Sequence, residues 1–374
     1  MISQELIAQI IFYTFCFITI IQILYYLYFF SRLAFYKPKE KTVIHQHPVS
    51  VVVCAKNEAA NLAKNLPGIL FQNYKTTHEV IVVNDNSEDD SKYVIDEYKK
   101  DFKNLNIIEL VQEAKFIAGK KFPLSMGIKS SKYETLLLTD ADCVPASENW
   151  ITNMQNGYAE GIEIVLGYGA YNKLPGILNK LIRFETFLTA IQYFSYALAR
   201  LPYMGVGRNL SYKKDVFIRN KGFSSINHLQ SGDDDLFINK VATKFNTAIV
   251  IDHESHTLSE PKKSFKHWIR QKNRHYTTAS FYKPKHKFLL GTYQATSFLF
   301  YPLLALSIIF FNWWIALIVY VVRLIFQAII YSKSMNKLNE KDLIPWFWLL
   351  DIWMFFYQLI FISALWKKPN QNWQ

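Results

Sequence analysis

The sequence predicts an α/β protein, with a mixed, mainly parallel sheet covered by helices on both faces and with transmembrane helices at both ends of the chain. Three observations predict this class. Strand-like runs of β-branched residues alternate with helical patterns over roughly residues 42–260. Strands that alternate with helices form βαβ units, whose parallel strands are buried on both faces. Acidic clusters follow such strands, and long apolar segments lie towards both termini.

The first βαβ unit begins with the β-branched run over 49–54, which is typical of a buried strand. A polar loop and a helical pattern over 59–71 follow, and then come strands over 79–83 and 105–110, separated by a charged helical pattern that runs to about 103. Ligands of open parallel sheets bind beyond the carboxyl ends of the strands. The loops after these strands are therefore where a functional site is expected.

A further apolar strand begins at Thr135 and ends in Asp140-Ala141-Asp142, and Pro145 soon ends any regular structure. Residues at i and i+2 of a strand point to the same side, so the two carboxylates are predicted to converge beyond the sheet. Such a pair suits a hard cation, Mg²⁺ or Mn²⁺, which keeps waters and takes substrate phosphates as its other ligands. The alternative is a pair of solvated turn residues.

Apolar segments at both ends predict attachment to a membrane. Residues 7–30 are long enough to cross a bilayer core of about 30 Å at 1.5 Å per residue. They lack a basic region before them and a small-residue cleavage site after them, which favours an uncleaved anchor. Three further candidates lie at 288–311, 313–331 and 343–366. The charge of Asp351 leaves open whether the last one spans the membrane, re-enters it or lies at its surface.

The net charge of +12 invites a nucleic-acid interpretation, but much of the excess flanks the apolar segments. The flanking residues are Arg32, Lys37, Lys39, Lys41, Lys283, Lys285 and Lys287. Such flanks favour a soluble domain on the cytoplasmic side of the cytoplasmic membrane, with the N-terminus outside. Four spans would return the C-terminus outside, whereas Lys367 and Lys368 argue for the inside. Nucleic acid is not an expected partner, because the mouth of the predicted sheet is acidic.

Other nucleotide-binding classes lack their motifs. No Gly-x-Gly-x-x-Gly follows the first strand, and no Gly-Lys-Ser/Thr phosphate loop occurs in the sequence. Gly119-Lys120-Lys121 instead precedes an amphipathic stretch over 122–130, where Lys120 can meet a phosphate or lie in a solvated turn. The three cysteines are few and scattered, so they indicate neither a disulfide framework nor a zinc site.

A series of motifs, in this order, resembles the membrane-bound inverting glycosyltransferases of family 2, which have a GT-A fold. The motifs are Ala55-Lys56-Asn57-Glu58, Asp85-Asn86-Ser87-Glu88-Asp89, Gly119-Lys120-Lys121, Asp140-Ala141-Asp142, Gly205-Val206-Gly207-Arg208-Asn209-Leu210-Ser211-Tyr212, Gly232-Asp233-Asp234-Asp235-Leu236 and Gln271-Lys272-Asn273-Arg274-His275. The resemblance covers roughly residues 48–280 and the flanking membrane segments.

The resemblance implies a site for a nucleotide sugar. Asp85 would contact the base, and Asn57 and Glu58 would line the nucleotide pocket. Asp142 would be the direct ligand of the metal, and Asp140 would reach the ribose or a metal-bound water. The expected contacts with the donor phosphates come from Lys120 and from Arg274, whose fork can bind two oxygens at once. Gln271 would contact the diphosphate or the acceptor. Asp85 could instead be an ordinary turn or helix-cap residue.

The catalytic base for inversion is expected among the acidic residues 233–235, where like charges raise at least one pKa. Comparison with Gly-Asp-Asp favours Asp234, whereas a register set by the pair Asp235-Leu236 favours Asp233. The helical pattern that follows from Leu236 shows that helix capping and catalysis can share this cluster.

The acceptor side is expected to involve Gly207 and Asn209. Trp268 and His275 share a helical face with Gln271 and Arg274, because they are spaced by three and four residues. The family has Trp where this chain has His275, so Trp268 could replace it as the stacking residue. The alternative is an amphipathic helix that lies on the membrane. The apolar segment over 174–203 could be core or could admit a lipid acceptor.

Four regions are therefore expected: an anchor (1–41), a cytoplasmic catalytic domain (42–260), an interfacial segment (261–287) and a C-terminal membrane region (288–374). The expected activity is metal-dependent transfer of a sugar from a nucleotide sugar, with a UDP-sugar as the expected donor, to a hydroxyl of a lipid or lipid-linked acceptor. A processive polysaccharide synthase is the alternative within the class. A small transporter is the alternative outside it, and it would depend on Arg323 and Asp351.

Overall fold

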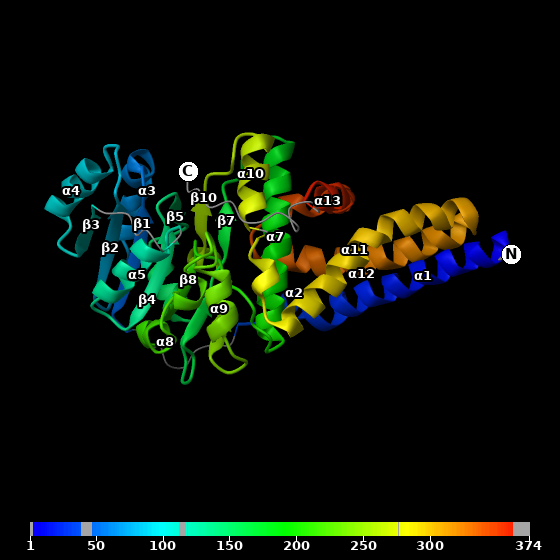
Figure 1. Ribbon diagram of the computed structural model, residues 1–374, viewed down its shortest axis with the longest axis horizontal. Helices are drawn as coiled ribbons and strands as arrows, with labels where there is room; N and C mark the ends of the chain where they lie inside the picture. The colour runs from blue at the N-terminus through cyan, green and yellow to red at the C-terminus, as the bar shows by residue number, and fades with distance from the viewer. Residues whose placement is uncertain (1–2, 39–46, 112–116, 118, 276, 362–374) are drawn as a thin grey trace.

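The computed structural model describes residues 3–38, 47–111, 117, 119–275 and 277–361, and the side chains of Arg274 and His275 lie outside that description. The described chain forms an α/β domain at one end and a bundle of long helices at the other (Figure 1). A crosswise helix, α7 (Ile177–Leu198), lies between these two parts.

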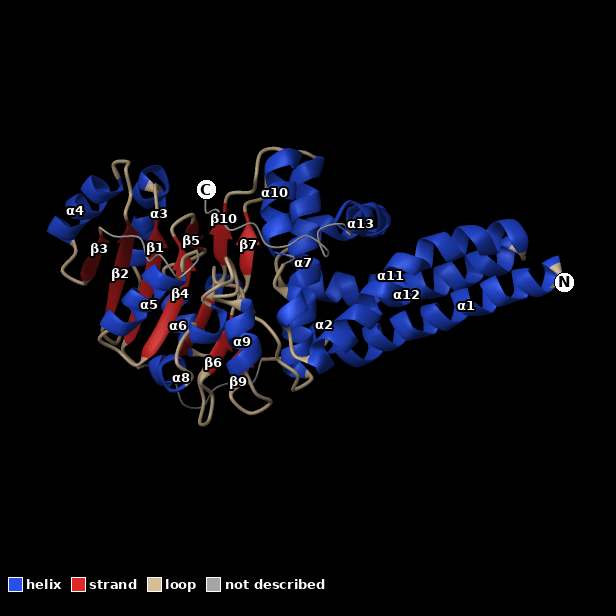
Figure 2. Ribbon diagram, viewed as in Figure 1, coloured by secondary structure: helices blue, strands red, loops and turns tan. Residues whose placement is uncertain are grey.

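A seven-stranded sheet forms the centre of the α/β domain (Figure 2), in the order β3-β2-β1-β4-β8-β6-β9. Its strands are β1 (Val49–Ala55), β2 (His78–Asp85), β3 (Leu105–Leu110), β4 (Thr135–Asp140), β6 (Ile164–Leu166), β8 (Leu210–Lys213) and β9 (Thr247–Ile249). All pairings are parallel except the two made by β8. The expected mixed, mainly parallel sheet is confirmed, with β1 to β4 within two residues of the predicted strands.

Alternating side chains of the strands fill two cores. Val51 and Val53 pack on one side with α3 (Ala59–Leu70), α4 (Ser91–Asp101) and α6 (Trp150–Gln155). Val52 points to the other side, towards α5 (Lys121–Ser130). Gly127 of α5 allows this close approach, because an added Cβ would lie 2.6 Å from the Val52 side chain. Both faces of the sheet are therefore covered, as near-continuous apolar strands require.

A second sheet of three short strands stands beside the first. It has the order β5-β10-β7, with β5 (Cys143–Pro145), β10 (Thr257–Ser259) and β7 (Gly169–Tyr171). The register places Ser259 between Cys143 and Tyr171. This sheet therefore carries the chain that follows Asp140 and forms one wall of the site.

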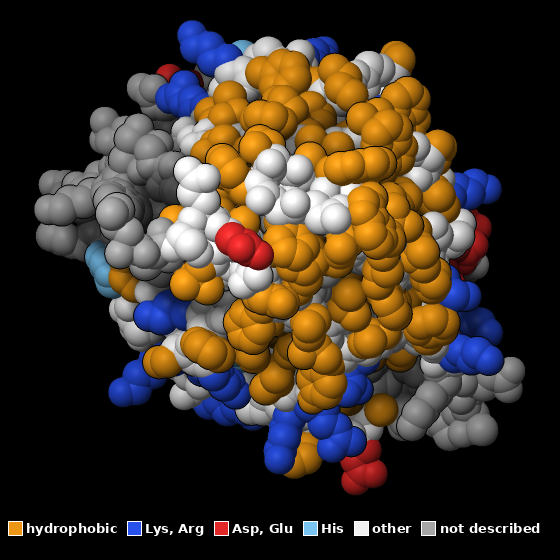
Figure 3. Space-filling view, turned by 90° about the vertical axis from the view of Figure 1, so that its right-hand side faces the viewer, with side chains coloured by type: hydrophobic (Ala, Val, Ile, Leu, Met, Phe, Trp, Pro, Cys, Tyr) orange, Lys and Arg blue, Asp and Glu red, His pale blue; other side chains and the backbone are white. Residues whose placement is uncertain are grey.

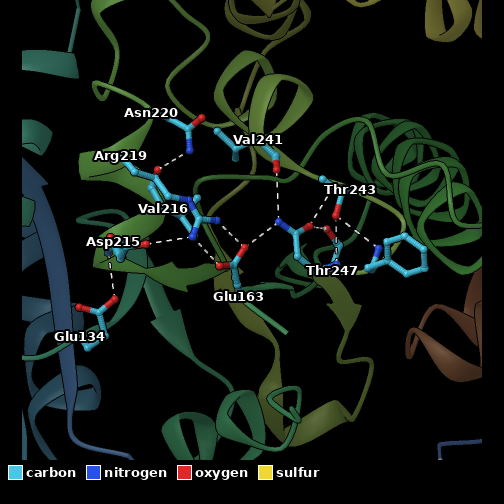
Figure 4. Close-up of polar contacts among 11 residues, drawn as sticks. Glu134, Glu163, Asp215, Val216, Arg219, Asn220, Val241, Thr243 and Thr247 are labelled. Carbon is cyan, nitrogen blue, oxygen red and sulfur yellow. Dashed lines mark hydrogen bonds and ion pairs between the residues drawn. The ribbon is translucent and has the colours of Figure 1, made fainter. Parts of the chain in front are cut away.

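A polar network far from the acidic clusters fastens α8 (Lys214–Arg219) to the start of β6 (Figure 4). Arg219 lies 2.6 Å from Glu163 and 2.9 Å from Asp215, and Asn246 donates to Glu163 at 2.9 Å. The hydrogen bonds from Arg219 lower the pKa of Glu163. The groups are partly exposed, so such pairs stabilise the edge by at most about 1 kcal/mol.

Helix α7 is largely core. Phe184, Phe187 and Phe194 are fully buried in a cluster that continues from the sheet into the bundle. At one end of α7, Arg183 bonds to Glu340 and Asp342, and it is 2% exposed. Helix α10 (Phe265–His275) packs beside α7 (Figure 1). The structure therefore favours the core interpretation of residues 174–203.

Four helical segments are long and apolar enough to cross a membrane by length and composition: 4–34, 284–310, 313–337 and 341–361. The first combines α1 (Gln4–Tyr25), a π-helical turn (Tyr26–Phe30) and α2 (Ser31–Ala34). The others are α11 (Pro284–Phe310), α12 (Trp313–Lys337), and a 3₁₀ turn (Lys341–Trp346) with α13 (Phe347–Phe361). The bundle surface is predominantly hydrophobic when seen from its free end (Figure 3).

The four segments do not share one direction. Helices α1, α11 and α12 run side by side, whereas α13 is seen nearly end-on in Figure 1 and therefore crosses them. Asp351 of α13 lies 2.8 Å from Arg323 of α12 and accepts a hydrogen bond from Tyr301 of α11 at 2.6 Å. Arg323 also donates to Gln22 of α1 at 2.6 Å. The two charges that the transporter alternative required neutralise each other inside the bundle.

Candidate active site

The site lies at the carboxyl ends of β1, β2 and β4. The register pairs Cys54 with Asp140 and Ala55 with Asn84, so the chain leaves these three neighbouring strands at one level. Asp85 is half-buried at the end of β2. The structure therefore brings Asp140 and Asp85 to one edge of the sheet, as the βαβ pattern predicts.

Lys120 connects two acidic clusters that are far apart in the sequence. Its Nζ lies 2.7 Å from Asp140 Oδ1 and 3.3 Å from Asp233 Oδ2. Burial disfavours the ammonium, but Asp140, Asp233 and Asp234 outweigh burial and raise the pKa of Lys120 well above its ordinary value. A small cavity of about 10 Å³ lies beside these groups and Gly207. Lys120 is therefore a permanent cation between the two clusters.

Asp234 is held by two backbone N–H donors. Gly207 N donates to Oδ2 at 2.7 Å, and Asp235 N donates to Oδ1 at 2.7 Å. Gly207 suits this approach, because a Cβ there would lie 3.3 Å from Lys120 Nζ and 3.4 Å from Asp234 Oδ2. Burial, followed by the charges of Asp233 and Asp235, raises the pKa of Asp234 to about 7. An oriented carboxylate with this pKa can accept a proton near neutral pH.

The third aspartate has a different environment. Asp235 is 8% exposed, and its Oδ2 accepts hydrogen bonds from Thr278 and from Tyr282, the latter at 2.8 Å. Its Oδ1 accepts from Leu236 N at 2.7 Å. Burial raises the pKa of Asp235, although the two hydroxyl donors oppose this effect. Asp235 is therefore engaged in protein contacts on both oxygens.

The residues that could hold a metal ion are Asp140, Asp142 and Cys143, whose ligand atoms lie within 4.8 Å of one another. Burial raises the pKa of the Cys143 thiol well above its ordinary value, so the group stays a neutral thiol. A hard divalent cation prefers carboxylate oxygens to a thiol. Burial and the charge of Asp140 raise the pKa of Asp142, as is usual for two close carboxylates. The pair fits Mg²⁺ or Mn²⁺.

Arg208 also belongs to this site, although no role was predicted for it from the sequence. Its guanidinium stacks 4.4 Å from the centre of the Tyr171 ring and lies 3.4 Å from Ser259 Oγ. Burial disfavours its charge, but the surrounding groups, including Asp142 and Asp140, raise its pKa. The sequence feature that could have indicated this role is the position of Arg208 directly after Gly205-Val206-Gly207. The small sheet, which brings Tyr171 and Ser259 beneath Arg208, was not predictable.

The loop after β1 is tied to the loop after β2. Asn57 N donates to Ser87 Oγ at 2.9 Å, and Asn57 Oδ1 accepts from Glu88 N at 2.8 Å. Asn57 has a φ of 56°, a left-handed conformation that Asn tolerates better than most residues. Burial raises the pKa of Glu58, and Asp142 and Asp140 add to the shift, so Glu58 faces the acidic pair. These residues build the wall next to Asp85.

Asn209 does not have the environment predicted for an acceptor-binding residue. Its side chain is fully buried: Trp150 Nε1 donates to its Oδ1 at 3.1 Å, and its Nδ2 donates to the carbonyls of Tyr168 and Ser255 at 3.0 and 2.7 Å. Because both ends of the amide are used inside the protein, Asn209 fixes the segment that carries Gly207 and Arg208.

Trp268 also differs from its predicted role as an acceptor-stacking residue. It is 2% exposed and packs against Tyr357 of α13, with ring centres 5.4 Å apart. It therefore joins α10 to the membrane region. Gln271 is half-buried on α10, and Lys272 pairs with Glu185 of α7. The side chains of Arg274 and His275 lie outside the described part, so their predicted roles stay predictions.

Comparison with known proteins gives a family match and several relatives. Residues 50–215 match the model of Glycosyl transferase family 2. The chain is 26% identical over 212 residues to Glycosyltransferase AglE of Haloferax volcanii, which covers 55% of this chain and 64% of that protein. It is 32% identical over 103 residues to Beta-monoglucosyldiacylglycerol synthase of Nostoc sp., covering 27% of this chain and 21% of that protein. The chain thus spans less than two thirds of these curated relatives.

A solved structure supports the fold over nearly the whole chain. The mannosyltransferase of Pyrobaculum calidifontis, in complex with GDP-Man and Mn²⁺, matches with a TM-score of 0.60 at 15% identity, covering 95% of this chain and 99% of that chain. At this identity the likeness concerns the fold, which is GT-A. Residues 50–215, with their parallel sheet and acidic carboxyl edge, are therefore similar to glycosyltransferase family 2, and the chain has a GT-A fold.

Proposed function

We propose that the protein transfers a sugar from a nucleotide diphosphate sugar to a hydroxyl of a lipid or lipid-linked acceptor, with inversion, at the cytoplasmic face of a membrane. The observation that carries this proposal is the bridge made by Lys120. Its ammonium joins Asp140, on the metal side, to Asp233, beside the candidate base Asp234. An inverting transferase needs charge stabilisation on the leaving-group side of the anomeric carbon and a base on the opposite side.

The donor would lie along the carboxyl edge of the sheet, with its base towards Asp85 and the wall formed by Asn57 and Glu58. Asp142 and Asp140 would hold Mg²⁺ or Mn²⁺, which supplies positive charge to the diphosphate when bound. Lys120 and Arg208 would add fixed positive charge to the same phosphates. The fold neighbour solved with GDP-Man and Mn²⁺ supports this donor class, and UDP-sugars remain our first expectation.

Asp234 would act as the base. In a single displacement the acceptor hydroxyl gives its proton to the carboxylate of Asp234, and the acceptor oxygen bonds to the anomeric carbon. The bond from that carbon to the phosphate oxygen breaks, and the nucleoside diphosphate leaves. The ammonium of Lys120 lies 3.3 Å from Asp233 Oδ2, so Asp233 is engaged with a protein cation, which favours Asp234 between the two. Gly207 N–H would keep the Asp234 carboxylate aimed during the transfer.

A membrane acceptor fits the arrangement of the helices. Three aligned helices and a crosswise α13 would place the N-terminus outside, and the catalytic domain and the start of α13 inside. Lys367 and Lys368, whose charge favours the inside, lie outside the described residues. This arrangement removes the conflict that four spans create. The glucosyldiacylglycerol synthase among the relatives supports a lipid acceptor by its name.

The test uses the full chain in bilayer nanodiscs that contain a total lipid extract. Labelled UDP-glucose, UDP-N-acetylglucosamine and GDP-mannose are supplied in turn with Mn²⁺, and lipid and polymer products are separated. We expect label in a lipid product. Asp142→Ala and Asp234→Asn should each lower transfer by about 10²-fold or more, whereas Asp101→Asn, an exposed change on α4, should leave it unchanged.

Four outcomes would contradict the proposal or a part of it. No transfer from any donor rejects the activity, and transfer that persists with EDTA and in Asp142→Ala rejects the metal role. Transfer that survives in Asp234→Asn but not in Asp233→Asn moves the base to Asp233. A long polymer as the sole product replaces lipid transfer with the processive alternative.

A further inference from the structure

The helix that carries the acidic cluster is fastened to the segment that leads into the membrane. Helix α9 (Asp235–Val241) begins directly after Asp234. Asp235 and Asn239 lie one turn apart on the same face of α9. Both bond to residues 278–286, which lie between α10 and the first turn of α11. Residues four apart on a helix lie on the same side, so the two side chains act on one partner segment.

The first contact is made by a buried carboxylate. Asp235 Oδ2 accepts from the hydroxyls of Thr278 and Tyr282, and these three residues are at most 9% exposed. Hydrogen bonds to a charged group contribute more than neutral ones, and leaving such a group without partners inside the protein is costly. The carboxylate therefore fixes the position of residues 278–282 relative to α9.

The second contact is made by a buried amide. Asn239 is 3% exposed: its Oδ1 accepts from Lys283 N at 3.0 Å, and its Nδ2 lies 2.8 Å from Tyr203 O and 3.0 Å from His286 Nδ1. His286 belongs to the first turn of α11. Asn239 therefore connects the start of a membrane helix to the core of the catalytic domain.

Asp235, whose side chain bonds to Thr278 and Tyr282, also orients the candidate base Asp234 through its backbone N–H. Asp235 N donates to Asp234 Oδ1 at 2.7 Å, while Gly207 N holds Oδ2 at 2.7 Å. The direction of an N–H depends on the backbone of its own residue. A change in the side-chain contacts of Asp235 is therefore transmitted to one of the two donors on Asp234.

We propose that Asp235 is a positioning residue, which uses its contacts with Thr278 and Tyr282 to aim the carboxylate of Asp234 according to the position of the membrane-connected segment. This inference rests on the proposed function. It gives the three consecutive aspartates three different tasks: Asp233 binds Lys120, Asp234 accepts the proton, and Asp235 transmits the position of the segment that leads into α11.

The test removes the donors and leaves all three aspartates intact. The double variant Thr278→Val/Tyr282→Phe should lower kcat about tenfold or more and leave the KM for the donor within twofold, because the base is misaimed while the donor pocket is intact. Thr278→Ser keeps a hydroxyl and should retain activity. The matched control Thr19→Val/Tyr98→Phe removes a Thr hydroxyl that bonds within α1 and a Tyr hydroxyl that bonds to Ala63 O, and it should leave kcat unchanged.

Amide hydrogen exchange supplies a readout that needs no activity. In the double variant, exchange at Asp235 and Gly207 should accelerate, while exchange in β1 and β2 should not. If the wild type transfers no sugar but this exchange pattern appears, the proposed function fails and the coupling stands. If kcat and the exchange at both amides equal those of the wild type, the positioning role is overturned. A uniform increase in exchange, with loss of folded protein, also overturns it, because Asp235 would then serve stability alone.

Discussion

The ammonium of Lys120 lies 2.7 Å from the carboxylate of Asp140, although 20 positions separate the two residues in the sequence. Lys120 precedes α5 and Asp140 ends β4, so the contact forms where a helix start meets the end of a neighbouring strand. The same ammonium reaches Asp233 at 3.3 Å. The Lys120 ammonium thus lies between the candidate metal-binding carboxylate Asp140 and the acidic run that contains the candidate base.

Replacement of Lys120 should disable transfer without unfolding the domain. Lys120→Met is expected to lower kcat about 10²-fold, since it removes a fixed charge that faces the phosphates and leaves Asp140 and Asp233 without their shared cation. Initial rates with saturating donor measure the effect. Lys129→Met, on the exposed end of the same helix, is the control and should match the wild type. Equal rates for Lys120→Met and the wild type would remove Lys120 from the site.

The rate should depend on pH through Asp234. Its pKa is about 7, so the carboxylate is protonated and unable to accept the acceptor's proton below that pH. We expect kcat/KM to fall about tenfold for each pH unit below 7 and to level off above it. The profile is measured between pH 5.5 and 8.5, with folding monitored by near-UV circular dichroism. A rate that is flat across this range, while the protein stays folded, would contradict the assignment.

Asn209 should matter for stability and hardly at all for acceptor affinity. Asn209→Ala leaves the buried Trp150 N–H and two carbonyls without their partner, which should lower the free energy of unfolding by about 2–3 kcal/mol. Thermal unfolding in detergent measures the loss. Asn220→Ala, which removes one bond to Val216 O, is the milder comparison. A stable Asn209→Ala protein with a raised acceptor KM would restore the original prediction.

Removing only one partner of the Arg323–Asp351 ion pair should lower the stability of the protein strongly. Arg323→Met leaves Asp351 as an unpaired charge among α1, α11, α12 and α13, and we expect destabilisation of about 3 kcal/mol or more. The double variant Arg323→Met/Asp351→Leu removes both charges and should recover most of that loss. Melting temperatures in one detergent compare the three proteins. A double variant less stable than Arg323→Met would show that the two charges do not act as a pair.

The sequence alone determined the class of the fold and the location of its site. Buried β-branched strands that alternate with helical patterns leave a parallel sheet as the natural solution, and carboxyl ends of parallel strands share one edge. Asp85 and Asp140 follow two such strands, so their proximity was predictable. The length and composition of the apolar segments likewise predicted the membrane helices, but not that α13 crosses the others, because packing sets the direction of a helix.

Only the tertiary structure decided which contacts each of these side chains makes. Periodicity says which residues share a face, but it does not say what that face meets. Trp268 therefore turned out to be buried against α13, and Asn209 to be a buried link between loops. The acidic run at 233–235 looked uniform in sequence. Lys120, Gly207 and Tyr282 come from distant segments, and their contacts alone give the three carboxylates different electrostatic environments.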